Sequence, residues 1–299
     1  MKTAIGIWIV RQQALDIGRY LATQLEAECN APSEISSPSN REAFTRRFPE
    51  HPQWVLIMTT GIAVRYVQGL LTDKTTDPGL VVLDEGCRFA VSLSGGHEGG
   101  ANQLAYRVAH LVGAVPVITT ATETLKPLVI GVGCRRGVST EQIDSAIEHG
   151  LMRIQRSRSE VREIATIDLK QDEPGLNGWC ERNGIALRVI PRELVQQRPW
   201  VTEPSAWVRK NIGVAGVCEA CALLATFRGR LVLPKTILDG VTVAIVEERI
   251  DVPLNQECTS NPVAAGSNSD NTQNSDTPIL HHSARKDSRT RTRTKRSTS

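Results

Sequence analysis

One short stretch of the sequence combines an imidazole and a carboxylate with a run of glycines. Residues 94–102 read Ser-Gly-Gly-His-Glu-Gly-Gly-Ala-Asn, so His97 and Glu98 stand between two pairs of glycines. Either side chain can take a proton from water, and the N–H groups of a loop can hold the oxyanion that then forms. Glycine also lets a backbone approach another molecule closely. The stretch therefore predicts an acid–base centre, with His97 or Glu98 as the base, on a ligand-binding loop.

The elements expected around this loop place it where α/β proteins hold ligands. The apolar run 89–93 predicts a strand before it, and the apolar spacing over 102–111 predicts a helix after it. A strand, a glycine loop and a helix N-terminus in this order favour anionic ligands. The spacing matches neither the dinucleotide motif nor the P-loop, and no serine elbow surrounds Ser94. The ligand-binding candidates of the loop are Ser94, Gly95, Gly96, Gly99, Gly100 and Asn102. The alternative is a loop that only turns the chain, with His97 in a local contact and Asn102 as a helix cap.

Three further positions carry side chains that suit a multiply charged ligand. Arg135 and Arg136 lie between glycines after an expected strand, where guanidinium groups can clamp carboxylates. Thr119 and Thr120, with Thr122 close behind, follow another strand end and either bind ligand or cap the next element. Glu219 begins an Ala-rich helix and either binds substrate or sits at an exposed helix start.

Cys218 and Cys221 have the C-x-x-C spacing of redox and metal sites. No second ligand pair lies nearby, and the apolar residues around them predict a buried helix in which cysteine acts as a small hydrophobe. We therefore expect no zinc, no redox role and no protein-bound metal at this motif.

Composition and charge narrow the class of protein. The chain has 299 residues, 40% hydrophobic content and only 4% aromatics, which favours cores of aliphatic residues. Its formal charge is +3, but residues 285–299 are strongly basic and 256–284 acidic, so residues 1–255 are neutral. We therefore expect no nucleic-acid partner. No apolar run approaches the ~20 residues of a membrane helix, so we expect no membrane partner. Seven scattered cysteines and no signal peptide favour the cytoplasm.

Alternating strand and helix patterns predict an α/β fold of two layered domains with mostly parallel sheets. The first domain is expected over residues 1–125, the second over 127–250, and a disordered Ser/Thr/Arg tail over 255–299. Strands are expected at 5–10, 55–58, 80–83, 89–93, 115–118, 128–132, 164–167, 186–190, 230–233 and 241–246. Helices are expected at 14–28, 62–71, 102–111, 139–154 and 217–227. The tail either binds an anionic or acidic partner or remains a solvated segment.

An ordered series of motifs resembles the cobalamin biosynthesis family CbiG, the cobalt-precorrin-5A hydrolases. In the first half the series comprises Thr-Gly-Ile-Ala-Val-Arg at 60–65, Lys-Thr-Thr-Asp-Pro at 74–78, 82–85, the glycine loop 94–102 and 117–122. In the second half it comprises 130–137, Lys170, Glu-Pro-Gly-Leu at 173–176 and 213–220. The pieces occur in family order over about residues 1–250.

The resemblance implies a substrate and a reaction. The family acts on a cobalt-bearing methylated tetrapyrrole with a δ-lactone, opens the lactone and releases acetaldehyde. It implies no cofactor of the protein itself, because the cobalt travels with the corrinoid substrate. Other enzymes of the corrin pathway, methyltransferases among them, are possible partners.

The sequence departs from the family in its middle. Many members carry an additional segment between the two halves, whereas only residues 123–127 join them here. This departure keeps a second hypothesis open, namely a non-catalytic tetrapyrrole carrier that works with the methyltransferases. A third, an α/β regulator with a basic tail for nucleic acid, explains neither glycine loop.

Overall fold

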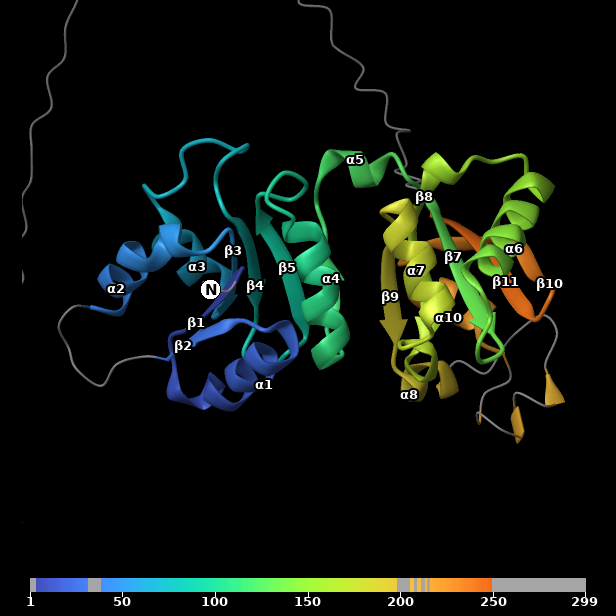
Figure 1. The fold of residues 1–299 in the computed structure, drawn as a ribbon, viewed down its shortest axis with the longest axis horizontal. Helices are drawn as coiled ribbons and strands as arrows, with labels where there is room; N and C mark the ends of the chain where they lie inside the picture. Colours follow the sequence, from blue (N-terminus) through green and yellow to red (C-terminus); the bar gives the residue numbers. More distant parts are fainter. Residues whose placement is uncertain are drawn as a thin grey trace, which may run out of the picture. The chain divides into compact units, whose positions relative to one another are not determined.

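The strands assemble into two separate sheets (Figure 1). The structure is a computed structural model that describes residues 4–31, 39–197, 205–206, 209–210, 213 and 216–248. Residues 1–251 form one compact unit. The tail expected at 255–299 lies outside the described residues, as do parts of the motif 213–220.

The first sheet has six strands in the order β2-β1-β3-β4-β5-β6. Their bounds are β1 Ile5–Ile9, β2 Glu28–Asn30, β3 Gln53–Ile57, β4 Gly79–Leu83, β5 Phe89–Ser94 and β6 Val115–Val117. Every neighbouring pair is parallel except β4 and β5, which run antiparallel. The loop after β5 therefore lies at the edge where β3 and β4 begin.

Two layers of helices cover this sheet, because alternate strand residues face opposite sides. Ile7, Val55 and Val81 pack with α1 (Leu15–Leu25) and α4 (Ala101–Val112). Trp8 and Trp54 pack on the other side with α2 (Asn40–Arg47) and α3 (Thr60–Val67). Ser39 begins α2 with a capping box to Glu42, which satisfies two backbone groups at the helix start. The short helix α5 (Ala121–Thr124) follows β6.

The second sheet has five strands in the order β10-β11-β7-β8-β9. Their bounds are β7 Leu128–Cys134, β8 Val161–Ile167, β9 Ala186–Ile190, β10 Gly229–Leu238 and β11 Val241–Glu248. Strands β7, β8 and β9 are parallel, while β10 and β11 form an antiparallel hairpin beside β7. Alternation along β7 again separates two cores. Ile130 and Val132 face α6 (Thr140–Arg153) and α7 (Pro174–Asn183), while Val129 faces α8 (Arg192–Gln196) and α10 (Cys218–Leu224).

The fold class predicted from the sequence is confirmed, because most neighbouring strands are parallel: four of five pairs in the first sheet and two of four in the second. All ten expected strands are present, with ends that differ by a few residues, and a capping box of Ser139 and Gln142 begins α6 within the helix expected there. The sequence analysis missed β2, α2, α5, α7 and α8 and the 3-10 turns Gln12–Ala14, Phe48–Glu50, Arg158–Glu160 and Asp168–Lys170. Whether the two sheet units fold independently remains a prediction.

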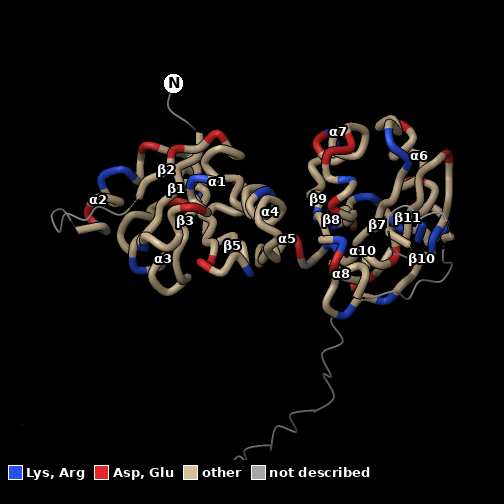
Figure 2. The backbone as a smooth tube through the Cα atoms, turned by 90° about the horizontal axis from the view of Figure 1, so that it is seen from below, with Lys and Arg blue, Asp and Glu red and all other residues tan. Residues whose placement is uncertain are grey.

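Both sheet units carry basic and acidic residues (Figure 2). No helix in the described part of the chain is long and apolar enough to span a membrane.

Arg158 joins three elements of the second unit through charged hydrogen bonds. Its guanidinium donates to Glu148 at 2.7 Å and to Asp144 at 2.9 Å, both on α6, and to Asn183 of α7 at 2.5 Å. It also lies 5.5 Å from the ring centroid of Trp179. Because each guanidinium bond replaces a bond to water, the net contribution of the residue is modest but well above that of a simple surface pair.

We expect Arg158→Ala to lower the free energy of unfolding by about 1.5–3 kcal/mol, the range for hydrogen bonds to charged groups. Urea denaturation followed by circular dichroism measures this loss. Arg182 also pairs with Asp144, at 3.3 Å, but its side chain is more exposed, so Arg182→Ala serves as the control with a loss below about 1 kcal/mol. Equal losses for the two variants would contradict a central role of Arg158.

Candidate functional site

The glycine loop 95–100 is fixed by bonds to the helix that follows it. The N–H groups of Ala101 and Asn102 donate to the carbonyls of Gly95 and Gly96, both at 3.0 Å, and Gly100 donates to His97 at 3.2 Å. Gly95 and Gly100 have φ angles of +67° and +71°, which L side chains rarely adopt. The glycine requirement inferred from the sequence is therefore real at these two positions.

A second constraint comes from the start of β4. A Cβ atom on Gly79 would collide with the carbonyl oxygen of Gly99. That same carbonyl accepts a hydrogen bond from the Gln53 side chain at 3.0 Å. Two neighbouring strands thus fix the far end of the loop, and only glycine at position 79 permits the approach.

Asn102 links the loop to the segment after β6. It is 7% exposed, its Oδ1 accepts from the Ser92 hydroxyl at 2.8 Å, and its Nδ2 donates to the Thr120 hydroxyl at 3.1 Å. The helix cap is instead Gly100, and Thr120 forms no side-chain cap to α5. The capping role considered for Asn102 was therefore wrong, whereas Thr120 occupies the N-cap position of α5 without a side-chain cap bond, and both residues brace the loop.

His97 and Glu98 lie at the exposed tip of this braced loop. The Nε2 atom of His97 forms a hydrogen bond with the Thr122 hydroxyl. This contact holds one ring nitrogen and leaves Nδ1 to act on a ligand. Thr122 is a residue that the sequence analysis named only with its neighbours, because a contact across 25 positions leaves no local signal. Thr119 is exposed, and Ser94 ends β5 half-buried.

The loop has fewer backbone N–H groups free to bind an oxyanion than its sequence suggests. The N–H groups of Gly100, Ala101 and Asn102 are occupied by carbonyls of the loop itself. An oxyanion at this site would need other donors, such as the Thr122 or Thr119 hydroxyl or an N–H group nearer to Glu98. The geometry therefore supports the acid–base role more strongly than the role of an oxyanion hole in the helix start.

Arg135 and Arg136 lie on the loop that follows β7, and both side chains are exposed. The Arg135 N–H donates to the Gly240 carbonyl at 3.0 Å, and the Gly137 N–H donates to Glu173 Oε1 at 2.7 Å. Glu173 is 5% exposed, and its other oxygen lies 3.4 Å from the Lys170 amino group. The sequence analysis listed Lys170 and Glu173 only as family motifs.

Glu219 is buried rather than at an exposed helix start. It is 2% exposed, and its Oε1 accepts from the Lys235 N–H at 2.8 Å. Lys235 lies where the pairing of β10 with β11 is irregular, so the carboxylate satisfies a backbone group that the ladder leaves open. Substrate binding by Glu219 remains a prediction, since its side chain is covered in this structure.

The Cys218 and Cys221 side chains are buried at 2% and 0% exposure. Burial raises the pKa of Cys218 to about 11 and that of Cys221 well above its usual value. A thiol with a pKa of 11 is only about one part in a thousand thiolate at pH 8, and the thiolate is the reactive form. The two cysteines thus behave as buried, unreactive side chains of α10.

We expect alkylation by iodoacetamide at pH 8 to modify Cys218 and Cys221 only after denaturation. Peptide mass spectrometry before and after unfolding measures this, with half-buried Cys87 as the internal reference. Native labelling of Cys218 at the rate of Cys87, or a disulfide between Cys218 and Cys221, would restore the redox hypothesis.

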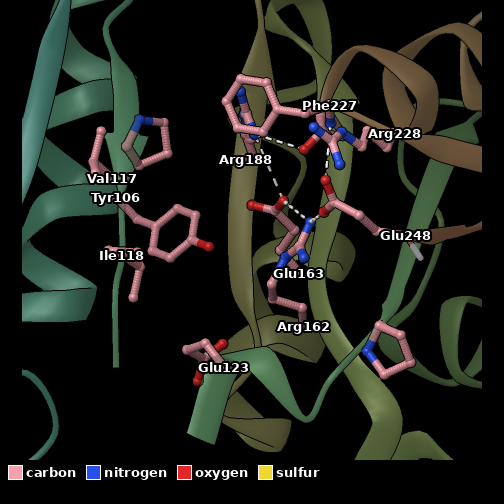
Figure 3. Close-up of a pocket in the computed structure, with 13 residues that line it drawn as sticks. Tyr106, Val117, Ile118, Glu123, Arg162, Glu163, Arg188, Phe227, Arg228 and Glu248 are labelled. Carbon is pink, nitrogen blue, oxygen red and sulfur yellow. Dashed lines mark hydrogen bonds and ion pairs between the residues drawn. The ribbon is translucent and has the colours of Figure 1, made fainter. Parts of the chain in front are cut away.

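A pocket of about 410 Å³ lies elsewhere in residues 1–251 (Figure 3). Its polar wall holds Glu163, which pairs with Arg162 and Arg188 at 3.6 Å each. Tyr106 and Phe227 also line it. Burial and the neighbouring Glu163 raise the pKa of Tyr106 well above its usual value. None of the site residues predicted from the sequence lines this pocket, and two of its three arginines, Arg162 and Arg188, are already paired with carboxylates.

Two family models match the chain. The model described as Cobalamin synthesis G N-terminal matches residues 42–123, and that described as Cobalamin synthesis G C-terminus matches residues 128–246. Together they include every site residue predicted from the sequence, with the first model containing the glycine loop and the second containing Arg135, Arg136 and Glu219.

Three known proteins illustrate the similarity. A cobalt-precorrin-5A hydrolase of Priestia megaterium is 25% identical over 311 positions, which cover 71% of this chain and 83% of that protein. The cobalt-precorrin-5A hydrolase of Salmonella typhimurium is 47% identical over 83 residues, 28% of this chain and 22% of that protein. The crystal structure of CobE, a protein from the cobalamin (vitamin B12) biosynthetic pathway, is 30% identical with a TM-score of 0.39, covering 41% of this chain and 90% of that one.

The first alignment is longer than this whole chain although it covers only 71% of it. The Priestia protein therefore has residues without a counterpart here, in agreement with the shortened middle expected from the sequence.

Proposed function

The chain belongs to the CbiG family of cobalamin biosynthesis proteins, and we propose that it is a cobalt-precorrin-5A hydrolase. The observation that carries the proposal is the exposed pair His97 and Glu98 on a loop braced at both ends, within the segment that matches the N-terminal family model. Two relatives that bear this name support it. The substrate is then a cobalt-bearing tetrapyrrole lactone, the protein adds no cofactor, and free cysteines fit a cytoplasmic location.

The proposed chemistry needs a base, an acid and a held substrate. His97 or Glu98 removes a proton from water, the resulting hydroxide adds to the lactone carbonyl, and the ring oxygen leaves and takes up a proton. The freed hydroxyl is carried by C20 and then loses its proton. Its oxygen forms the C=O bond of acetaldehyde as the bond between C20 and the ring carbon breaks in a retro-aldol-like step, and the ring carbon keeps the electron pair and takes up a proton. Overall, one water is consumed, and the Thr122 hydroxyl, which bonds to His97 Nε2, is the group next to the base that can orient it.

A second candidate function is favoured by the shortened middle of the chain. A carrier would bind the tetrapyrrole lactone and pass it to the methyltransferases of the pathway without opening it. Such a protein would keep the carboxylate-binding arginines but would not need an exposed base on a rigid loop. We prefer the hydrolase because the loop that carries His97 is held by hydrogen bonds at both ends.

A single-turnover experiment separates the two functions. The cobalt-bearing lactone is mixed with an excess of protein, and the bound tetrapyrrole is analysed by mass spectrometry. The proposal expects a tetrapyrrole that has gained one water and lost one acetaldehyde. A tightly bound but unchanged lactone would support the carrier and overturn the hydrolase.

A further inference from the structure

The loop after β7 presents two cations that the described part of the chain leaves unpaired. Six arginines of the second sheet unit form ion pairs, namely Arg156, Arg158, Arg162, Arg182, Arg188 and Arg192. Within the described residues, Arg135 and Arg136 have no such partner, and the same holds for Arg153, Arg228 and Arg230; only Arg135 and Arg136 lie on the loop after β7. The carboxylate that does meet their loop, Glu173, bonds to the Gly137 N–H and to Lys170 instead.

This loop is held from two sides. On one side, the Arg135 N–H donates to Gly240, the turn residue between β10 and β11. On the other, Glu173 accepts from the Gly137 N–H at 2.7 Å. Gly137 has a φ of +79°, a conformation that the bond to Glu173 stabilises. Both arginines therefore stand on a backbone with little freedom, which lowers the entropy lost when they bind a ligand.

Glu173 is itself held in place by close packing and by an ion pair. Gly175, two residues further on, touches the Val138 carbonyl so closely that a Cβ atom there would collide with it. Glu173 is 5% exposed, and burial of a carboxylate is costly unless it is paired and hydrogen-bonded. Lys170, whose side chain is 15% exposed, supplies the pairing charge. Burial raises the pKa of Cys134 to about 11, and Lys170 acts against this rise, so the lysine charge lies near the end of β7 as well.

The place of the loop also favours a ligand. It leaves the carboxyl end of β7, next to the segment that leaves the parallel strand β8. Open α/β sheets bind ligands at the carboxyl ends of their parallel strands. Guanidinium groups match a carboxylate in geometry and charge, and one buried anion balanced by a lysine leaves the loop positive.

We propose that Glu173 and Lys170 are positioning residues that hold Arg135–Gly137 as a binding site for a carboxylate group of the tetrapyrrole. The proposal rests on the proposed substrate but not on its hydrolysis. Glu173 acts through the Gly137 N–H, and Lys170 pairs with the other carboxylate oxygen of Glu173 and so holds the side chain toward the loop. Neither residue touches the reacting lactone.

The test is titration of each variant with the cobalt-bearing tetrapyrrole, followed by absorbance. We expect Arg135→Ala with Arg136→Ala to raise Kd by about 10- to 100-fold, the range for a lost charged hydrogen bond. Glu173→Ala should raise Kd by a similar factor, whereas Glu173→Gln, which keeps an oxygen for Gly137, should recover part of the affinity. Where the protein turns over, KM should rise while kcat stays near that of the parent.

Arg230→Ala is the matched control. Arg230 is exposed and lies opposite Glu247 in β11, at the end of the sheet where β7 begins. Parent-like Kd in the double arginine variant, whose exposed side chains are not needed for folding, would overturn the proposal even if Glu173→Ala fails to fold. A protein that binds through these residues but releases no acetaldehyde would leave this site in place and overturn only the hydrolase function.

Discussion

Replacement of His97 by alanine is expected to lower kcat for acetaldehyde release by a factor of ~10²–10⁴, the usual contribution of a general acid–base group. The imidazole lies at the tip of a loop whose ends are fixed by Asn102 and Gly79, so its loss should not disturb the fold. The variant should bind the tetrapyrrole with nearly the parent Kd. The comparison needs kcat from the acetaldehyde assay and Kd from titration on the same preparation.

His110 supplies the control for this prediction. It is also a partly exposed histidine with one polar partner, Gln171 at 3.0 Å, but it lies near the other end of α4. His110→Ala should leave kcat close to the parent value. If His97→Ala and Glu98→Gln both release acetaldehyde at the parent rate, the base lies elsewhere in the molecule.

Gly79→Ala should damage both the fold and the site. The added methyl group would collide with the Gly99 carbonyl, and backbone atoms on both sides leave no flexible side chain to move away. Overpacking of this kind typically costs 1–3 kcal/mol. Because relief requires Gly99 to move, the Gln53 bond breaks and the His97 loop shifts, so activity should fall more than stability alone explains. Urea denaturation and kcat measured well below the unfolding midpoint separate the two effects.

Gly61→Ala is the matched change for Gly79→Ala. Gly61 lies in α3, where a Cβ atom would meet only the end of the Arg65 side chain at 3.5 Å, and alanine favours helix over glycine. This variant should be as stable as the parent or slightly more stable. A Gly79→Ala protein that is equally stable and fully active would show that the close contact of Gly79 with Gly99 does not fix the loop.

The helices and strands could be predicted from the sequence where the spacing of the apolar residues and the length of the apolar run were clear. The apolar runs that became β1, β4, β7 and β11 are continuous and bounded by polar residues, so they could be recognised without tertiary information. The helix α7 was missed because Pro174, Gly175 and Gly178 resemble a loop, although proline is well placed in a first turn. The strand β2 has three residues and gives no usable pattern.

The candidate site was only partly predictable, because its supports are distant in sequence. His97 and Glu98 could be chosen from residue type. The contact of the loop with Gly79, however, depends on the antiparallel pairing of β5 with β4, and that of His97 with Thr122 on the parallel pairing of β5 with β6, neither of which a local pattern encodes. Glu219 was chosen from the sequence because burial of a carboxylate is costly unless it has a role. In the structure its carboxylate accepts a hydrogen bond from the backbone N–H of Lys235. Glu173 was overlooked because its role appears only when Gly137 lies beside it.

The proposed function requires that this chain by itself performs the hydrolysis at the His97 loop. The most direct test is release of acetaldehyde by the purified chain under multiple turnover, with the cobalt-bearing lactone in excess and no other protein present. We expect many equivalents of acetaldehyde per protein molecule, and a rate that falls by ~10²–10⁴ in His97→Ala. No acetaldehyde from a parent protein that binds the lactone would contradict the proposed function.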